Sequence, residues 1–226
     1  MTQLFRNLLL GSLLVITLQA AKAQENSTNK FKDTTVVQYW PNGVPKTLRT
    51  YNEEGQLHGP QFNYRQVGSI TKLEHYKNGV LHGPFLKISN RGKVAEEAAY
   101  KNGNIDGPHT HYYATGKKQQ MATYQEGLKV GKAIWYYTNG NMSTLLTYKE
   151  NVLEGEAKSF YQKGNVKEIY AYEENLRQGE YREFFENGKI KVQGEFKDDK
   201  KHGKWIYFDE EGQEIKTEKY RKGELR

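Results

Sequence analysis

The chain of 226 residues has no cysteine, and its 34 Lys and Arg against 27 Asp and Glu give a formal net charge of +7 at pH 7. The lack of cysteine excludes disulfides, thiolate metal sites, a thiol nucleophile and lipid attachment at an N-terminal Cys. Basic residues alternate with acids instead of clustering, which argues against a nucleic-acid interface.

The first 23 residues have the pattern of a secretory signal peptide. Arg6 precedes the apolar run 8–18, and the small residues Ala21 and Ala23 follow it. The run has about half of the roughly 20 residues that a membrane-spanning helix needs. We therefore expect cleavage after Ala23 and export to the periplasm or the medium. Residues 24–35 are polar, and we expect them to form a flexible lead-in.

From Val36 onward the chain repeats with a period of 24 residues. Two columns contain glycine without exception: Gly59, Gly83, Gly107, Gly131, Gly155, Gly179 and Gly203, and Gly68, Gly92, Gly116, Gly140, Gly164, Gly188 and Gly212. A third column contains only residues that readily adopt a left-handed backbone: Gly55, Gly79, Gly103, Gly127, Asn151, Asn175 and Asp199. Such self-similarity predicts a repeat array in which one supersecondary unit stacks on the next.

The repeating unit is predicted to be a β-hairpin. Asn-Gly dipeptides between apolar or aromatic runs, as at Asn102-Gly103 and Asn139-Gly140, are a strong signal for a tight reversal. A helix is disfavoured, because a glycine or proline every few residues costs about 1 to 3 kcal/mol each in a helix interior. We predict an all-β fold, an elongated antiparallel meander of stacked β-hairpins with 24-residue repeats that fills residues 36–226 with about eight units.

Three local departures from a plain hairpin are also predicted. The glycine column that includes Gly131 lies inside the longer arm, where we expect a bulge that absorbs a surplus residue and bends the strand. Residues 51–55 have one residue more than residues 76–79, so we expect a longer turn there. The last full strand, residues 213–220, is highly charged, which suits an exposed terminal edge.

Aromatic residues form three further columns. Two are predicted to be core ladders: Tyr64, Ile88, Tyr112, Tyr136, Phe160, Phe184 and Phe208, and Tyr76, Tyr100, Tyr124, Tyr148, Tyr172, Phe196 and Tyr220. The third, Tyr113, Tyr137, Tyr161 and Phe185, directly follows the first column and should lie on the opposite face. We expect these four residues to form a ligand-binding aromatic stripe for a protein or glycan. The alternative is that they pack against the stems of neighbouring Lys and Gln side chains.

Histidine gives the only pattern that resembles a metal site. His58, His82 and Asp106 share one column, and His109 and His111 lie two apart on one strand face. Column mates are two strands apart, about 9.6 Å, whereas zinc ligands converge to about 2 Å from one ion. We therefore expect no metal site and no cofactor, and interpret these histidines as solvent-facing turn residues. The sequence contains no nucleophile elbow, phosphate-binding loop or HExxH motif, so we predict no enzymatic activity.

The unit Tyr-Lys-Asn-Gly-Val-Leu-His-Gly at residues 76–83, together with an aromatic pair followed by Asn-Gly, resembles the MORN repeat in its variant form. The resemblance covers residues 36–223. It implies stacked β-hairpins in an elongated sheet that serves as a scaffold for protein contacts or, in some cases, membrane lipids. Bacterial chains made of the variant repeat alone resemble antitoxin components of toxin–antitoxin modules, a role that fits poorly with export.

Two functions are therefore expected as alternatives. The first is an exported, non-enzymatic scaffold that mediates protein–protein interaction through one sheet face. The second is an antitoxin or immunity component that sequesters a cognate toxin. A membrane lipid or a glycan is a further candidate ligand, and no nucleic-acid partner is expected.

Overall fold

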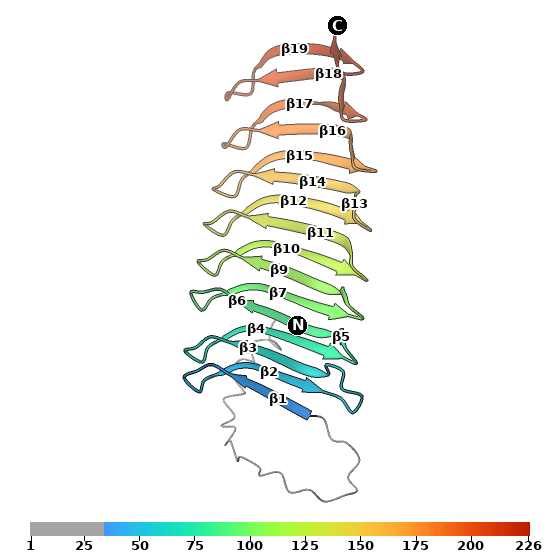
Figure 1. Ribbon diagram of the computed structural model, residues 1–226. Helices are drawn as coiled ribbons and strands as arrows, with labels where there is room; N and C mark the ends of the chain where they lie inside the picture. The colour runs from blue at the N-terminus through green and yellow to red at the C-terminus, as the bar shows by residue number, and fades with distance from the viewer. Residues whose placement is uncertain (1–33) are drawn as a thin grey trace, which may run out of the picture. The chain divides into compact units, whose positions relative to one another are not determined.

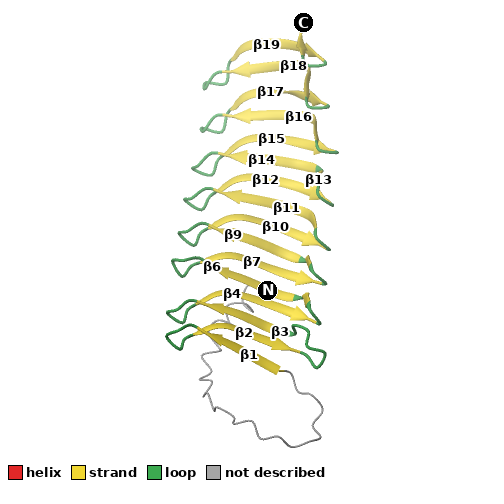
Figure 2. Cartoon of the chain, viewed as in Figure 1, coloured by secondary structure: helices red, strands yellow, loops and turns green. Residues whose placement is uncertain are grey.

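The computed structural model describes residues 34–226, which form one antiparallel sheet of stacked hairpins without a helix in that range (Figures 1 and 2). The predicted signal peptide and nearly all of the predicted lead-in lie outside the described residues. The first strand begins at Thr34, two residues before Val36. The predicted all-β array of hairpins is confirmed.

Long strands that are neighbours in the chain pair antiparallel, and each two-residue strand pairs with the long strand that precedes it. The strands are β1 (Thr34–Tyr39), β2 (Pro45–Tyr51), β3 (Gly59–Tyr64), β4 (Ile70–Lys77), β5 (Val80–Leu81), β6 (Gly83–Ile88), β7 (Val94–Lys101), β8 (Asn104–Ile105), β9 (Gly107–Tyr112), β10 (Lys118–Gln125), β11 (Leu128–Tyr136), β12 (Met142–Lys149), β13 (Val152–Leu153), β14 (Gly155–Phe160), β15 (Val166–Glu173), β16 (Leu176–Phe184), β17 (Ile190–Lys197), β18 (Lys200–Phe208), β19 (Glu214–Arg221) and β20 (Glu224–Leu225).

On one side of the sheet the strands are joined by two-residue turns, which we call the narrow turns, except for one longer turn after β2. Asn102 and Gly103 join β7 to β8 with φ angles of 51° and 85°, as a type I′ turn requires. The same left-handed backbone occurs at Asn175, where φ is 69°. The column of Gly, Asn and Asp is thus explained by turn geometry. The longer turn after β2 is also confirmed, since the Asn52 N–H donates to the Gln56 carbonyl at 2.9 Å.

On the opposite side of the sheet the strands are joined by three-residue turns, which we call the wide turns. Between β11 and β12 the Tyr137 N–H donates to the Asn141 carbonyl at 2.8 Å, and the Gly140 N–H donates to the Tyr137 carbonyl at 2.9 Å. Gly140 has a φ of 99°, which glycine adopts at little cost. The second invariant glycine column therefore marks these wide turns.

A bulge interrupts the longer arm of each hairpin at the remaining glycine column. In the β10–β11 pair, Met121 lies opposite Ile134 and Thr123 lies opposite Val130, so residues 131–133 face Ala122 alone. The predicted bulge is confirmed, although it absorbs two surplus residues rather than one. In other repeats the same interruption divides the arm into two strands, as in β5 and β6.

The two faces of the sheet differ in burial. We call the face that carries Ala98, Ala122, Ala133, Ala157 and Trp205 the inner face, because all five residues are at most 4% exposed. The opposite face is called the outer face. On β10, Tyr124 lies two residues after Ala122 and therefore shares the inner face, and its ring is 5.8 Å from that of His109.

The predicted core ladders lie on opposite faces of this single layer. Tyr124 and its column are on the inner face, whereas Tyr112 directly follows His111 on β9 and points to the outer face. Most members of both columns are half-buried, and Phe160 and Phe196 are the members with less than 9% exposure. The two predicted ladders therefore run along opposite faces of one layer, and within residues 34–226 no second layer covers either face.

Residue size alternates across the strand pairs at the centre of the inner face. Phe85 lies opposite Ala98, and Ala157 lies opposite Tyr170. Near the C-terminus Tyr181 lies opposite Gly194. A large side chain on one arm thus fills the space that a small residue leaves on the other.

Candidate functional site

The aromatic stripe lies at the start of the wide turns and links successive repeats. Each tyrosine hydroxyl donates to a backbone carbonyl 23 residues further along: Tyr113 to Tyr136 at 2.6 Å, Tyr137 to Phe160 at 2.7 Å and Tyr161 to Phe184 at 2.7 Å. Phe185 has no hydroxyl, and Trp40 makes the equivalent bond from its indole N–H to the Tyr64 carbonyl at 3.2 Å. Sequence reasoning missed these bonds, which give the stripe a structural role. Its binding role stays a prediction.

The stripe borders the inner face. The Lys191 ammonium pairs with Glu183 at 2.8 Å and lies 5.9 Å from the centre of the Phe185 ring. Glu183 lies opposite Val192, which is one of the buried residues of the inner face. The rings of the stripe therefore form a rim along one side of this face.

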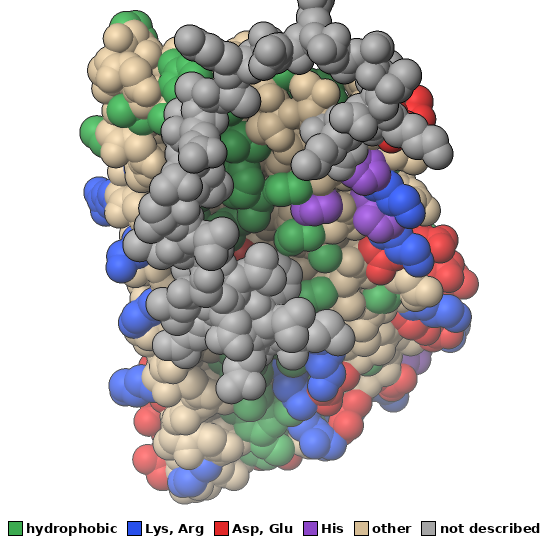
Figure 3. All heavy atoms as spheres, turned by 90° about the horizontal axis from the view of Figure 1, so that it is seen from below, with side chains coloured by type: hydrophobic (Ala, Val, Ile, Leu, Met, Phe, Trp, Pro, Cys, Tyr) green, Lys and Arg blue, Asp and Glu red, His purple; other side chains and the backbone are tan. Residues whose placement is uncertain are grey.

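Cations lie over several aromatic rings of the inner face. The Lys129 ammonium is 4.6 Å from the Tyr148 ring centre, and the Arg177 guanidinium is 4.0 Å from the Phe196 ring centre. Lys201 lies 4.3 Å from the Trp205 ring centre. Such contacts contribute about 0.5 to 1 kcal/mol at exposed sites. Viewed along the array, hydrophobic side chains lie in the middle and charged side chains gather at the sides (Figure 3).

The phenols of the inner face are held in their neutral form. Burial raises the pKa of Tyr124 and Tyr148, and burial together with neighbouring Tyr172 raises the pKa of Tyr170 to about 12. Burial, followed by the charge of Glu168, raises the pKa of Tyr181, whose hydroxyl donates to that carboxylate at 2.9 Å. These side chains offer uncharged rings and hydrogen-bond donors at neutral pH.

The column of His58 and His82 lies at the narrow turns and has a structural role there. Nδ1 of His58 is 3.4 Å from the Asn78 backbone nitrogen, and Nδ1 of His82 is 3.5 Å from that of Asn102. In later repeats Glu154 accepts a hydrogen bond from the Glu174 N–H at 3.0 Å in the same way. Residues of this column therefore hold the turn of the next repeat.

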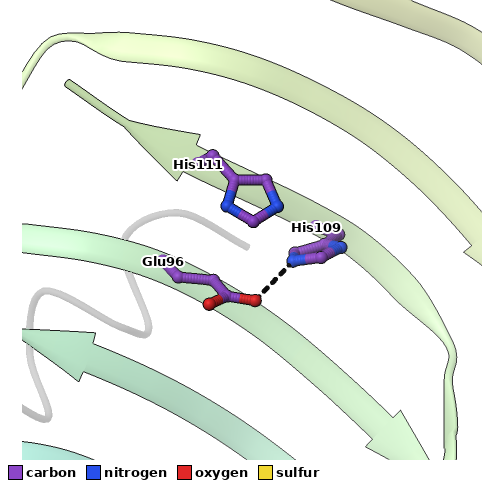
Figure 4. Close-up of side chains that lie close together, drawn as sticks. All are labelled: Glu96, His109 and His111. Atoms are coloured by element: carbon purple, nitrogen blue, oxygen red, sulfur yellow. Dashed lines mark hydrogen bonds and ion pairs between the residues drawn. The ribbon is translucent and has the colours of Figure 1, made fainter.

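His109 and His111 meet a carboxylate that sequence reasoning did not pair with them. Glu96 on β7 lies directly opposite His111 on β9, and Oε1 of Glu96 is 2.9 Å from Nε2 of His109 (Figure 4). The potential ligand atoms of the three residues all lie within 4.8 Å of one another. To identify Glu96 from the sequence, one would have needed the exact register between two arms that are joined by a turn.

A hollow of about 530 Å³ lies near the C-terminal end of the array. Its lining residues are Glu180, Gln193, Gly194, Glu195, Lys204 and Ile206. The lining is mainly charged and polar, unlike the mostly apolar walls of a small-molecule site. This hollow is therefore a weak candidate for a ligand site.

Within residues 34–226, no helix has the length and apolarity that crossing a membrane would require.

Comparisons with known proteins identify the repeat. The family described as MORN repeat variant matches residues 105–126, 129–150, 153–174 and 177–198. No curated protein matches the sequence.

Two solved structures show distant likeness. A mutant of the Photorhabdus luminescens Tc holotoxin pore is 10% identical, with 77% of this chain and 14% of that chain covered and a TM-score of 0.18. The crystal structure of TcdB2-TccC3-Cdc42 is also 10% identical, with 82% and 15% covered and a TM-score of 0.16. The chain therefore spans only 14% and 15% of the length of those chains. Likenesses with such low TM-scores say nothing of the function of this protein.

Proposed function

The chain carries a tandem array of MORN repeat variants over residues 105–198, and on this premise we propose that it is an exported, non-enzymatic scaffold that binds a protein partner along the inner face. Repeat arrays commonly use one extended face for binding. The observation that carries the proposal is the column of half-buried rings on the inner face, which nothing else in residues 34–226 covers.

The composition of this face fits a protein partner. Tyrosine, tryptophan and arginine are the residue types that most often dominate binding energy in protein interfaces. The inner face presents the rings of Tyr124, Tyr148 and Trp135, with the Lys129 ammonium among them. A partner that offers carboxylates beside apolar side chains would complement both features.

Export is supported by the N-terminal sequence. Arg6, the apolar run 8–18 and the small residues Ala21 and Ala23 form the three parts of a secretory signal peptide. The intact mass of the protein recovered from the cell envelope or the medium should correspond to a chain that begins at Gln24. A mass that includes residue 1 would contradict export by cleavage.

The binding proposal is tested by capture of partners from the envelope fraction, followed by reconstitution with the purified candidate. The double variant Tyr137→Ser and Tyr161→Ser removes two rings of the stripe. The matched control, Tyr137→Phe and Tyr161→Phe, keeps the rings and removes only the hydroxyl bonds to Phe160 and Phe184. Circular dichroism establishes that both variants are folded.

A protein that binds the wild type and the Phe variant in a fixed ratio, but does not bind the folded Ser variant, would support the proposal. If that protein is a toxin, it would specify an antitoxin or immunity role for the same face. Capture of no protein, or equal binding by all three forms and by a Tyr124→Ser, Tyr148→Ser variant, would overturn the inner-face proposal.

A further inference from the structure

We propose that Glu96, His109 and His111 form a binding site for one divalent transition-metal ion, most suitably Zn²⁺, on the inner face. The site is independent of the scaffold proposal, because it depends on three residues in two neighbouring strands. It would leave positions on the ion open to water or to a ligand from outside the chain.

The sheet places the three side chains on one face. His109 and His111 are two residues apart on β9, so their side chains point the same way. Glu96 reaches them because β7 pairs with β9 and brings it directly opposite His111. The close-up shows the carboxylate beside the two imidazole rings (Figure 4). No rearrangement of the backbone is needed to bring the three together.

The distances suit a shared ion. Two ligand atoms at about 2.1 Å from one ion are about 3.0 to 3.4 Å apart, and Oε1 of Glu96 is 2.9 Å from Nε2 of His109. The ring centres of His109 and His111 are 4.5 Å apart, and the rings are tilted by 49°. All three ligand atoms lie within 4.8 Å of one another, so binding one ion calls for side-chain rotations without movement of the strands.

Small neighbours leave room for the site. His109 lies opposite Ala122, which is 2% exposed, and Ala98 on β7 is 4% exposed. The side chains of His109 and Glu96 keep 12% and 21% of their surface exposed. The ligands are therefore held by packing, yet an ion can reach them from the solvent.

The chemistry of the ligands indicates the class of metal. Imidazole and carboxylate together suit Zn²⁺ and its transition-metal neighbours, whereas Mg²⁺ and Ca²⁺ prefer oxygen ligands alone. A neutral imidazole is the form that binds a metal.

The other repeats do not have these three residues at the equivalent positions. At the position of His109 the other repeats have Gln61, Phe85, Ala133, Ala157, Tyr181 and Trp205, and at the position of His111 they have Asn63, Lys87, Trp135, Ser159, Glu183 and Tyr207. The column of Glu96 contains one other acid, Glu168, which faces Ser159 and Tyr181 instead of histidines. Sheet architecture alone therefore does not require two histidines and a glutamate here.

Residues next to the site affect how strongly it would bind a cation. Lys87 on β6 lies opposite Glu96, and Gln120 on β10 lies opposite His111. The Lys87 ammonium repels a cation, so its removal should strengthen metal binding. The amide of Gln120 is neutral and leaves the charge of the site unchanged.

The test is isothermal titration calorimetry of the full chain, purified without a polyhistidine tag and freed of metal, with ZnCl₂ as the only ligand. We expect one ion per chain. Glu96→Gln, His109→Gln and His111→Gln should each weaken binding by about 10- to 100-fold, the effect seen even for outer partners of metal ligands. Lys87→Gln should tighten it severalfold.

The matched control is Glu97→Gln, on the same strand as Glu96 but facing Tyr112 on the outer face. It should bind zinc as the wild type does. Thermal unfolding gives a second measurement, because an ion that binds the folded chain raises Tm. The rise should occur in the wild type and in Glu97→Gln and be lost in the folded His111→Gln variant. Absence of both heat and Tm shift at millimolar ZnCl₂, or equal binding by the triple Gln variant, would overturn the proposal.

Discussion

The inner face is built differently in the middle of the array and at its C-terminal end, although the repeat is the same. In the middle, the most buried positions are occupied by Ala122, Ala133 and Ala157. At the C-terminal end Trp205 is 2% exposed and packs with Val192 and Phe196. The middle of the face therefore consists of small residues bordered by half-buried rings, and the end is a filled aromatic cluster.

The difference follows from which arm of the hairpin carries the large residue. Near the C-terminus the ring of Trp205 lies over Gly194, and the ring of Tyr181 stacks on it with centres 5.3 Å apart. In the middle, Ala133 lies opposite Leu146. The array thus has one end that is stabilised by an aromatic cluster, and a middle in which small residues lie beside His109 and His111.

The largest effect is expected for Trp205→Ala. This substitution removes the largest fully buried side chain of the described residues and should lower the free energy of unfolding by about 3 to 5 kcal/mol. Trp135→Ala, in the middle of the same face, removes a half-buried ring and should cost less than half as much. Urea unfolding followed by far-UV circular dichroism compares the two. Equal losses would show that the two regions are packed alike.

A smaller effect is expected for Gly194→Ala. A Cβ at this position would lie 2.4 Å from Cδ2 of Trp205, and such overpacking costs about 1 to 3 kcal/mol. In the Trp205→Ala background the ring is absent, so the same substitution should be neutral or stabilising. A double-mutant cycle in urea measures the coupling. Additive effects in the double variant would contradict the proposed contact.

The smallest effect concerns acid stability at the C-terminal end. Hydrogen bonds from Lys216, Tyr207 and Tyr220 lower the pKa of Glu218 from 4.5 to about 2. Because the folded pKa is the lower one, the stability that this carboxylate contributes is present above pH 4.5 and is lost as the pH falls toward about 2. We expect the tryptophan fluorescence of the folded chain to change within this window.

The control for the acid transition is Glu218→Gln, which keeps the hydrogen-bond acceptor and removes the ionisable group. Its fluorescence should change less across the same window, and its stability at neutral pH should be lower than that of the wild type. An identical transition in wild type and variant would assign the acid sensitivity to other carboxylates.

Much of the fold could be predicted because turn chemistry is local. Gly140 and Asn102 indicate where the backbone reverses, and Gly131 indicates where an arm bends. The burial of individual columns could not be predicted in the same way. Tyr124 and Tyr112 look equally apolar in the sequence, and their placement on opposite faces of the single layer formed by residues 34–226 becomes apparent only when the strands are paired.

The candidate sites were predicted less well for a related reason. The stripe residues Tyr137 and Tyr161 were identified as a group, but their hydroxyl bonds to the next repeat depend on how hairpins stack. His109 and His111 were noticed because they are near in sequence. Glu96 was missed because its proximity depends on the register between β7 and β9.

The sequence by itself determined the period, the turn positions, the alternation of faces and hence the all-β array, because each depends on the backbone preference of a few adjacent residues. Only the tertiary structure decided which face is the more buried, which rings pack against a neighbouring side chain and which carboxylate lies beside the two histidines. Those outcomes depend on the register of paired strands and on side-chain size across each pair, which no single segment of the chain specifies.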